Sequence, residues 1–280
     1  MQLSGRKHFS ILFEIEYLVL MLFTVMLLGA AEVSASSADA LWPEFTGEGV
    51  VVDGSLMLDY SHAANGYVIC GTAAPSGNEL KLRVTFGDKQ LTYDLDAQGR
   101  TEIFPLQLGS GYYAFDLYEN VGGSKYAGAG QVGLDVQLES ETAAFLVPNQ
   151  YVYYTRESPS VKKSDEISSG SQSEIYQSVC DFMASEFSYD FVRAQTIAPG
   201  SLPEVDSCYE MRSGICQDLA AVMVSMLRVQ GIPSKLVIGY ADGYYHAWTS
   251  SIVDGEEKFF DPTVAVDALR ASNYSTERFY

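Results

Sequence analysis

One cysteine in the sequence has the surroundings of a nucleophile. Cys216 follows Ser213-Gly214-Ile215 and opens an apolar segment with helical periodicity. A thiol in the first turn of a helix lies at the positive end of the helix dipole and near free backbone N–H groups, and both favour the reactive thiolate. Gly214 allows a sharp turn before the helix and lets a substrate approach. This pattern predicts a nucleophile at residue 216.

A cysteine nucleophile needs an imidazole base, and the imidazole needs a third group that orients it. His246 is predicted on the strand after the Asp242-Gly243 hairpin turn, and Trp248 shares its face because alternate strand residues point the same way. Asp261 ends the next strand, so pairing of the two strands is expected to bring it beside His246. The three residues together predict a catalytic triad.

A metal site built from these residues is the weaker interpretation. One Cys, one His and one Asp could ligate zinc, but the chain has neither a second histidine nearby nor a close pair of cysteines. No metal and no other cofactor is therefore expected.

The elements that must position the triad are predicted as two helices followed by a three-stranded antiparallel meander. Apolar residues at helical spacing predict helices over 173–187 and 216–230, with a loop over 189–206 between them. Strands are expected at 234–241, 244–253 and 258–260, separated by Asp-Gly turns.

The residues before these helices show a different pattern. Short alternating runs rich in Val, Tyr, Leu and Phe, separated by turn residues, predict an antiparallel β-sandwich over 41–154. Seven of the 19 residues in 155–173 are serine, which predicts an exposed linker. The catalytic domain is expected over 174–280, so the fold class is α+β.

Several motifs together resemble the transglutaminase-like superfamily. They are the stretch SGICQDLA at 213–220, the run LRVQGIP at 227–233, the triplet His246-Ala247-Trp248 and the triplet Asp261-Pro262-Thr263. The resemblance implies a papain-like core over 174–280, with Cys216 as nucleophile, His246 as general base and acid, and Asp261 as the orienting carboxylate. The β-rich part resembles the region that precedes this domain in some exported bacterial proteins.

The chain departs from the family pattern at the oxyanion site. Animal-type transglutaminases place a tryptophan upstream of the cysteine, whereas this chain has no tryptophan between Trp42 and Trp248. The backbone N–H of the cysteine remains as one donor, and the side-chain donor is expected among three residues. The candidates are Tyr189, Gln195 and Tyr209, and Trp248 and Gly214 are expected to line the substrate site. No Asp-rich calcium loop is present, so calcium activation is not expected.

Composition excludes two classes of partner. Asp and Glu number 36 against 17 Lys and Arg, which gives a formal charge of −19. A general nucleic-acid binder needs a basic surface, and so does a protein that adheres to anionic lipid, so neither is expected. Hydrophobic residues make up 47% of the chain, enough to bury a core.

The N-terminus has the pattern of a signal peptide. Arg6 and Lys7 precede an uncharged run of 15 residues at 17–31, and small residues lead to a predicted cleavage site after Ala35. Export to the cell surface or medium is expected, with no stable membrane insertion after cleavage; an uncleaved anchor is the alternative. In an exported protein, Cys70, Cys180, Cys208 and Cys216 could form two disulfides, or at most one if Cys216 is the nucleophile.

The predicted function is that of an exported thiol acyl-transfer enzyme acting on peptide or carboxamide bonds through a cysteine thioester. Resolution of the thioester by water gives a peptidase or deamidase, and resolution by an amine gives a cross-linker. The expected partner is a peptide or protein substrate, with cell-wall and cell-surface peptides as candidates. The alternative is a non-catalytic cell-surface binding protein that retains the fold.

Overall fold

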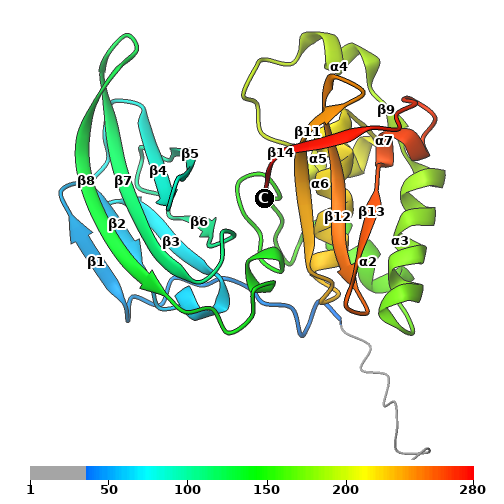
Figure 1. The fold of residues 1–280 in the computed structure, drawn as a ribbon, viewed down its shortest axis with the longest axis horizontal. Helices are drawn as coiled ribbons and strands as arrows, with labels where there is room; N and C mark the ends of the chain where they lie inside the picture. Colours follow the sequence, from blue (N-terminus) through cyan, green and yellow to red (C-terminus); the bar gives the residue numbers. More distant parts are fainter. Residues whose placement is uncertain (1–35) are drawn as a thin grey trace, which may run out of the picture. The chain divides into compact units, whose positions relative to one another are not determined.

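Two four-stranded antiparallel sheets make up the N-terminal part of the computed structural model, which describes residues 36–280 (Figure 1). The strand orders are β1-β2-β3-β6 and β5-β4-β7-β8. The elements are β1 (Val50–Asp53), β2 (Leu56–Asp59), η1 (Ala63–Asn65), β3 (Tyr67–Thr72), β4 (Leu80–Phe86), β5 (Lys89–Leu95), β6 (Glu102–Pro105), β7 (Gly111–Gly122), β8 (Lys125–Val136) and η2 (Ala143–Phe145).

Alternation of apolar and polar residues explains these strands. In β4, Leu80, Leu82 and Val84 are buried, while the residues between them are only half-buried. Because successive side chains of a strand point to opposite faces, one face of each sheet is apolar. Leu58 of the first sheet and Leu82 of the second are both fully buried and belong to one hydrophobic cluster.

The C-terminal part combines helices with a third four-stranded sheet of order β13-β12-β11-β14 and a short parallel pair, β9 and β10 (Figure 1). The elements are α2 (Pro159–Ile167), α3 (Gln172–Glu186), β9 (Ser188–Tyr189), α4 (Phe191–Thr196), α5 (Val205–Met211), β10 (Ser213–Gly214), α6 (Cys216–Arg228), β11 (Ser234–Ala241), β12 (Tyr244–Val253), β13 (Glu256–Phe260), α7 (Pro262–Ala265) and β14 (Tyr274–Phe279).

Helix α6 is the central element of this part. Every residue from Asp218 to Arg228 is buried, because the helix packs on β11 and β12 and also contacts α2, α3 and α5. A helix that is covered all round is apolar all round, which explains the run LAAVMVSML at 219–227. This burial holds the first turn of α6, and with it Cys216, in a fixed position.

The serine-rich segment 155–173 differs from the exposed linker that its composition predicts, because it contains α2. Val161, Ser160 and Ser164 are buried in that helix. The Ser164 hydroxyl donates to the Met226 carbonyl at 2.7 Å, and the Ser225 hydroxyl donates to Ser160 Oγ at 3.0 Å. Serine here is a small residue that allows two helices to approach and satisfies its own hydroxyl in the contact.

Two further differences affect the site. The segment predicted as a loop, 189–206, contains α4 and the start of α5, and the predicted meander gains a fourth strand, β14. The sequence of β14, YSTERF, has little apolar character, and its burial is mostly partial or absent. The predicted hairpin turns are present: Asp242 and Gly243 connect β11 to β12 with φ of 47° and 87°, as a tight turn of this type requires.

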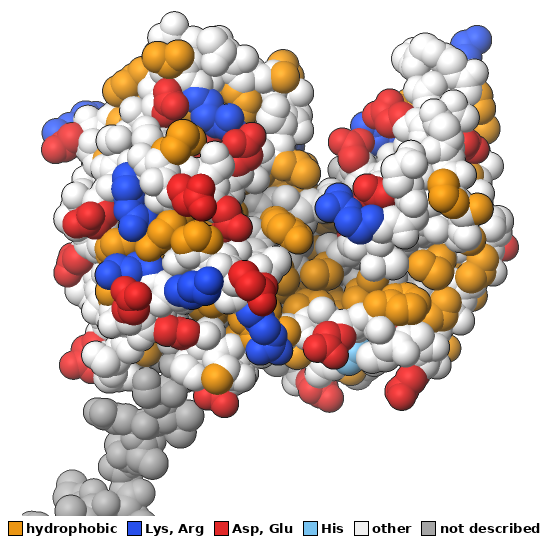
Figure 2. All heavy atoms as spheres, turned by 180° about the vertical axis from the view of Figure 1, so that it is seen from behind, with side chains coloured by type: hydrophobic (Ala, Val, Ile, Leu, Met, Phe, Trp, Pro, Cys, Tyr) orange, Lys and Arg blue, Asp and Glu red, His pale blue; other side chains and the backbone are white. Residues whose placement is uncertain are grey.

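All four cysteines are free among the described residues, so the disulfides that the cysteine count allowed do not form here. Within residues 36–280, no helix has the length and apolar character needed to cross a bilayer. The predicted signal peptide, 1–35, lies outside the described residues. On the face drawn in Figure 2, acidic and basic side chains are interspersed rather than segregated by sign.

Arg228 at the end of α6 is expected to be a major contributor to stability. It is 1% exposed and donates to the carbonyls of Ser234, Val147 and Tyr280 at 2.9, 2.5 and 2.8 Å. Burial lowers the pKa of its guanidinium to about 10, so it is still charged at neutral pH. Arg228→Met removes the guanidinium donor from all three carbonyls, of which that of Tyr280 keeps the Leu236 N–H, and is expected to lower the free energy of unfolding by about 2–4 kcal/mol in urea titrations.

The matched control for this substitution is Arg270→Met. The Arg270 side chain is 82% exposed and pairs with an equally exposed Asp267. Exposed ion pairs contribute little, so the control is expected to unfold like the wild type. Equal unfolding curves for Arg228→Met and the wild type would show that the buried guanidinium is not a structural requirement.

Candidate active site

The first turn of α6 carries Cys216, and an acidic residue three positions after the helix cap holds that turn. Asp218 Oδ2 accepts a hydrogen bond from the Ile215 backbone N–H at 3.1 Å. A carboxylate in this position satisfies a free N–H group of the helix start and complements the helix dipole. Cys216 is the first helical residue and is only partly buried, so its thiol is accessible.

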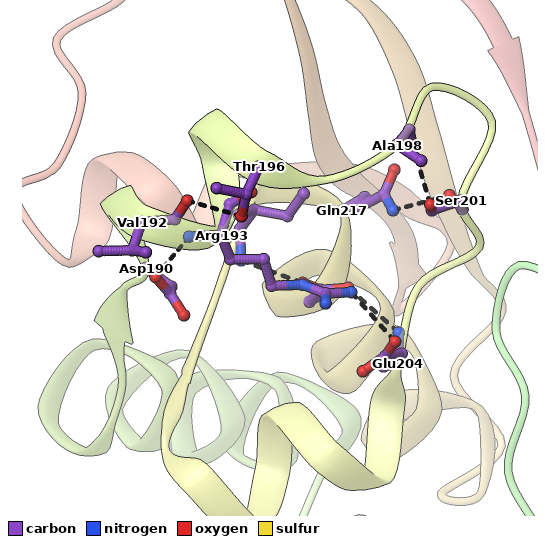
Figure 3. A network of polar contacts seen from close by, with 10 residues as sticks. Asp190, Val192, Arg193, Thr196, Ala198, Ser201, Glu204 and Gln217 are labelled. Carbon is purple, nitrogen blue, oxygen red and sulfur yellow. Dashed lines mark hydrogen bonds and ion pairs between the residues drawn. The ribbon is translucent and has the colours of Figure 1, made fainter.

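Asp218 also anchors the segment that precedes the helix in the sequence. Its carboxylate is 1% exposed and accepts from Arg193 Nε at 2.9 Å and from the Glu204 backbone N–H at 3.1 Å. Gln217 Nε2 donates to the Ser201 carbonyl at 3.0 Å. Figure 3 shows Arg193 reaching from α4 towards Glu204, and Gln217 beside Ser201. Helix α4 and the loop after it are therefore tied to the first turn of α6.

The parallel pair β9–β10 places Tyr189 close to the start of α6, which carries Cys216. Tyr189 is the register partner of Gly214, and the Asp190 N–H donates to the Gly214 carbonyl at 3.0 Å. Cys216, through its charge and its backbone N–H, is among the groups that act on the pKa of the Tyr189 hydroxyl. Burial, with nearby negative charge, raises the pKa of Tyr189 to about 12, so it keeps its proton at neutral pH. The Tyr189 hydroxyl is thus a protonated donor in the neighbourhood of Cys216.

His246 and Asp261 form a buried pair. His246 Nε2 lies 2.8 Å from Asp261 Oδ2, and each residue is 5% exposed. The other carboxylate oxygen, Oδ1, accepts from the backbone N–H groups of Thr263 and Val264 at 2.9 and 3.3 Å, because Asp261 caps helix α7. The cap fixes the carboxylate, and the carboxylate in turn orients the imidazole.

The imidazole of His246 is held in its cationic form. Burial has the largest influence on its pKa and disfavours the charge. Hydrogen bonds and charge interactions with Asp261 and Cys216 outweigh burial and raise the pKa to about 9. At neutral pH the ring is therefore an imidazolium next to the cysteine sulfur. A thiol, an imidazole and a carboxylate joined in this order define a candidate cysteine-dependent site.

Tyr274 of β14 is a site residue that the sequence patterns did not indicate. Its hydroxyl donates to Asp261 Oδ2 at 2.8 Å, the same oxygen that bonds His246. Its ring packs against Trp248 and Phe259 with centroid distances of 5.1 and 4.7 Å. No local motif marks it, because β14 reaches this place only through its pairing with β11. Asp218, by contrast, could have been found from its spacing to the helix start.

Replacing Tyr274 with phenylalanine is expected to change the pH dependence of activity. The substitution keeps the ring packing and removes one donor from Asp261, which leaves more of the carboxylate charge to stabilise the His246 cation. The fall in kcat/KM at high pH is therefore expected to move upwards, with a loss of about 3- to 10-fold at the optimum. Measurement of kcat/KM from pH 6 to 10.5 checks this.

The control is Tyr240→Phe, which removes a hydroxyl from the neighbouring strand β11. It is expected to leave the pH profile of the wild type unchanged. An unaltered alkaline limb in Tyr274→Phe would mean that Tyr274 contributes packing alone.

The remaining predicted site residues occupy different surroundings. Gln195 is exposed on α4, and Tyr209 is buried in an aromatic cluster with Phe182 and Phe187. Trp248 is 3% exposed, with its ring centroid 6.3 Å from that of His246, so it packs beside the imidazole. Of the three oxyanion candidates, Tyr189 is the one that the β9–β10 register pairs next to the start of α6.

Gly214 is required by packing inside the protein. It is buried, and a Cβ atom there would come within 2.5 Å of Cys208 Sγ and 2.8 Å of Asp218 Cβ. The absent side chain allows β10 to approach α5 and α6. Among residues 36–280, no group of three or more His, Cys, Asp and Glu side chains is arranged to hold a metal ion.

A comparison with protein families assigns a domain to the C-terminal part of the chain. Residues 162–260 match the model of the transglutaminase-like superfamily. The chain therefore carries a transglutaminase-like domain, and the match includes Cys216 and His246 and ends one residue before Asp261. It also begins inside α2, in the segment that composition assigned to a linker.

Three solved structures illustrate the range of similarity. A proposed cysteine protease from Cytophaga hutchinsonii is 16% identical over 74% of this chain and 80% of its own, with a TM-score of 0.36. A proposed protease from Parabacteroides distasonis is 17% identical over 67% and 38%, with a TM-score of 0.32. Red sea bream transglutaminase is 12% identical over 77% and 49%, with a TM-score of 0.27. These values are too low to define an activity, and no curated protein matches the chain.

Proposed function

We propose that this protein is a thiol acyl-transfer enzyme that acts on peptide or carboxamide bonds through a thioester on Cys216. The observation that carries the proposal is the buried His246–Asp261 hydrogen bond, together with the influence of Cys216, at the start of a buried helix, on the pKa of that imidazole. A purely structural histidine has no need of both a thiol and a capped carboxylate as neighbours.

The first half of the reaction forms the thioester. The Cys216 thiolate attacks the carbonyl carbon, a carbon–sulfur bond forms, and the carbonyl oxygen becomes an oxyanion. The tetrahedral intermediate collapses, the carbon–nitrogen bond breaks, and the His246 imidazolium gives its proton to the departing amine. Asp261 holds the imidazole in place throughout.

The second half releases the acyl group. His246, now neutral, takes a proton from water or from an acceptor amine as that molecule attacks the thioester carbonyl. The carbon–sulfur bond then breaks and the thiolate is restored. Water yields a carboxylate, as in a peptidase or deamidase, and an amine yields a new amide. The same residues serve both outcomes, so the choice depends on which nucleophile reaches the thioester.

The developing oxyanion requires donors that are already in place. The hydroxyl of Tyr189 is protonated at neutral pH and lies near the start of α6, and we propose that it forms the oxyanion site together with the backbone N–H of Cys216. Tyr189→Phe is expected to lower kcat by about 10²-fold with little change in KM, since it removes a donor used mainly in the transition state. Steady-state kinetics check this.

Tyr209→Phe is the matched control for Tyr189→Phe. Tyr209 was an equal candidate from sequence, and its ring lies in the cluster with Phe182 and Phe187. It is expected to retain the kcat of the wild type. If instead both variants lose activity equally, the loss reflects a change in folding, and a catalytic role for the Tyr189 hydroxyl is excluded.

Two parts of the proposal concern the rest of the chain. The pattern of residues 1–35 supports export, which would place the enzyme at the cell surface or outside the cell. The shared core of the two N-terminal sheets supports a β-sandwich in front of the catalytic domain. Cell-surface and cell-wall peptides are then the substrates to test first.

Product analysis by mass spectrometry tests the proposal. Peptides containing glutamine or internal amide bonds are incubated with the enzyme, with and without an added primary amine. Hydrolysis of a peptide bond adds one water across the two fragments, and deamidation adds about 1 Da. Amine transfer to a glutamine adds the mass of the amine less that of the released ammonia, while rapid acid quenching traps the acyl group on Cys216. Absence of every product and of any adduct on Cys216 over a broad peptide pool contradicts the enzyme and favours a binding protein.

A further inference from the structure

A buried carboxylate lies two residues from the nucleophile and is not used by the mechanism. Asp218 is 1% exposed, and each of its three hydrogen bonds among the described residues is accepted from an N–H group, of Arg193, Glu204 or Ile215. An ionised carboxylate accepts only, so this set of partners suits the charged form. The carboxylate caps α6, but its negative charge is also close to the place where the Cys216 thiolate must form.

A negative charge at this position disfavours the thiolate. Like charges repel, and the repulsion is stronger in a buried site than in water. Burial raises the pKa of Tyr189 to about 12, and the charges of Cys216 and Asp218 both add to this effect, so the two groups act on the same neighbourhood. Without compensation, the helix cap would oppose the reactivity that the helix dipole and His246 promote.

Arg193 supplies the opposite charge. Its Nε donates to Asp218 Oδ2 at 2.9 Å, and the same oxygen accepts from the Ile215 N–H and so caps the helix. Burial lowers the pKa of Arg193, but the hydrogen bond and the charge of Asp218 outweigh burial and raise it above its usual value. The guanidinium is therefore a permanent cation. Its side chain is only 23% exposed, so salt and water screen the pair weakly.

The other ionisable groups around the thiol and the carboxylate do not supply this charge. They are Tyr189 on β9, Asp190 before α4, Glu204 before α5, Cys208 on α5, His246 on β12 and Asp261 before α7. Burial raises the pKa of Tyr189 and Cys208, which are therefore neutral, and His246 pairs with Asp261. Glu204 is acidic and lies 3.5 Å from Arg193 Nη2 (Figure 3). Arg212, a second cation after α5, lies over the Tyr209 ring at 3.8 Å.

We propose that Arg193 is a positioning residue that neutralises Asp218, so that the helix carrying Cys216 can have both a carboxylate cap and a reactive thiolate. Arg193 acts through Asp218 and does not touch the substrate. Helix α4 has no buried residue, so core packing does not explain why it lies against α6, whereas this ion pair does. The inference rests on the proposed function and adds to it a residue from a different helix.

Alkylation of Cys216 by iodoacetamide tests the proposal without turnover. The labelling rate of the peptide that contains Cys216 is measured by mass spectrometry over a range of pH. Arg193→Met leaves the buried Asp218 carboxylate without its cation. Labelling at pH 7 is expected to slow about tenfold, and the pH of half-maximal rate is expected to move up by about one unit.

A second substitution separates charge from tethering. Asp218→Asn removes the negative charge and keeps an oxygen that can accept from the Ile215 N–H. The double variant Arg193→Met/Asp218→Asn is therefore expected to label within about threefold of the wild type, although the ion pair is gone. A purely structural tether predicts the opposite result, because the double variant has lost both partners.

The matched control is an ion pair in the N-terminal sheets. Arg83 Nη2 of β4 lies 3.0 Å from Asp116 Oδ2 of β7, and both side chains are partly buried. Arg83→Met and Arg83→Met/Asp116→Asn make the same chemical changes there. Both are expected to leave the labelling of Cys216 unchanged at every pH.

The outcomes separate this inference from the proposed function. Labelling of Arg193→Met at or above the wild-type rate, a double variant as slow as Arg193→Met, or equal slowing in the Arg83 variants overturns the role of Arg193, even where the enzyme turns peptides over. Slow labelling in Arg193→Met that the double variant restores supports this role. It does so even where no peptide is turned over, a result that would count against the acyl-transfer chemistry alone.

Discussion

Replacing Cys216 with alanine is expected to abolish turnover, with a loss on the order of 10⁴-fold or more in kcat. The mechanism has no second group that could form the covalent intermediate, because the sulfur is the only atom bonded to the acyl group. The loss should appear in both hydrolysis and amine transfer, since both pass through the same thioester. Initial rates on the best peptide from the product analysis measure it, together with the acid-trapped adduct.

Cys180→Ala is the matched control for this substitution. Cys180 is 4% exposed, and burial raises the pKa of its thiol to about 12, so it is protonated and unreactive at neutral pH. Burial likewise raises the pKa of the Cys70 and Cys208 thiols. Iodoacetamide is therefore expected to modify Cys216 selectively in the folded protein. Retained turnover in Cys216→Ala, or parallel losses in the two variants, would refute the nucleophile.

Replacing His246 with alanine is expected to lower kcat/KM by about 10³-fold at neutral pH. Asp261 and Cys216 raise the pKa of His246 to about 9, so the ring carries its proton below that pH and loses it above. Protonated His246 both stabilises the thiolate and supplies the proton for the leaving amine. Wild-type activity is therefore expected to fall as the pH rises through about 9. The residual activity of the His246→Ala variant should not show this decrease.

Labelling with iodoacetamide gives a second measure of the same interaction. Without the imidazolium, the Cys216 thiolate loses its neighbouring positive charge, and labelling at pH 7 is expected to slow about tenfold or more. His62→Ala removes the other histidine of the described residues and is expected to change neither rate. Labelling of His246→Ala at the wild-type rate would show that the imidazole and the sulfur do not interact in solution.

Local patterns explain how much of the site could be expected from the sequence. The helical periodicity after Cys216 and the Asp-Gly turns around His246 are short-range features, and they predicted α6 and the β11–β12–β13 arrangement with small boundary differences. Strand pairing then suggested that Asp261 would come near His246, and the structure places their side-chain atoms 2.8 Å apart.

Other parts of the site depend on contacts that no local pattern carries. Tyr274 reaches Asp261 only because β14 pairs with β11, and three oxyanion candidates were equivalent until the β9–β10 register placed Tyr189 close to the start of α6. Segment 155–173 was misjudged for the same reason. Serine content describes solubility, whereas the burial of Ser160 and Ser164 comes from packing on α6.

The sequence by itself determined which residue types were available for chemistry and the order in which they occur: a cysteine at a helix start, a histidine on a strand, and an aspartate after the next strand. Such features are local, because capping, periodicity and turn geometry depend on neighbours along the chain. Only the tertiary structure decided which phenol lies near the nucleophile, which hydroxyl shares the carboxylate, and which arginine pairs with the helix cap. Those properties depend on contacts between distant segments, which form only when the core packs.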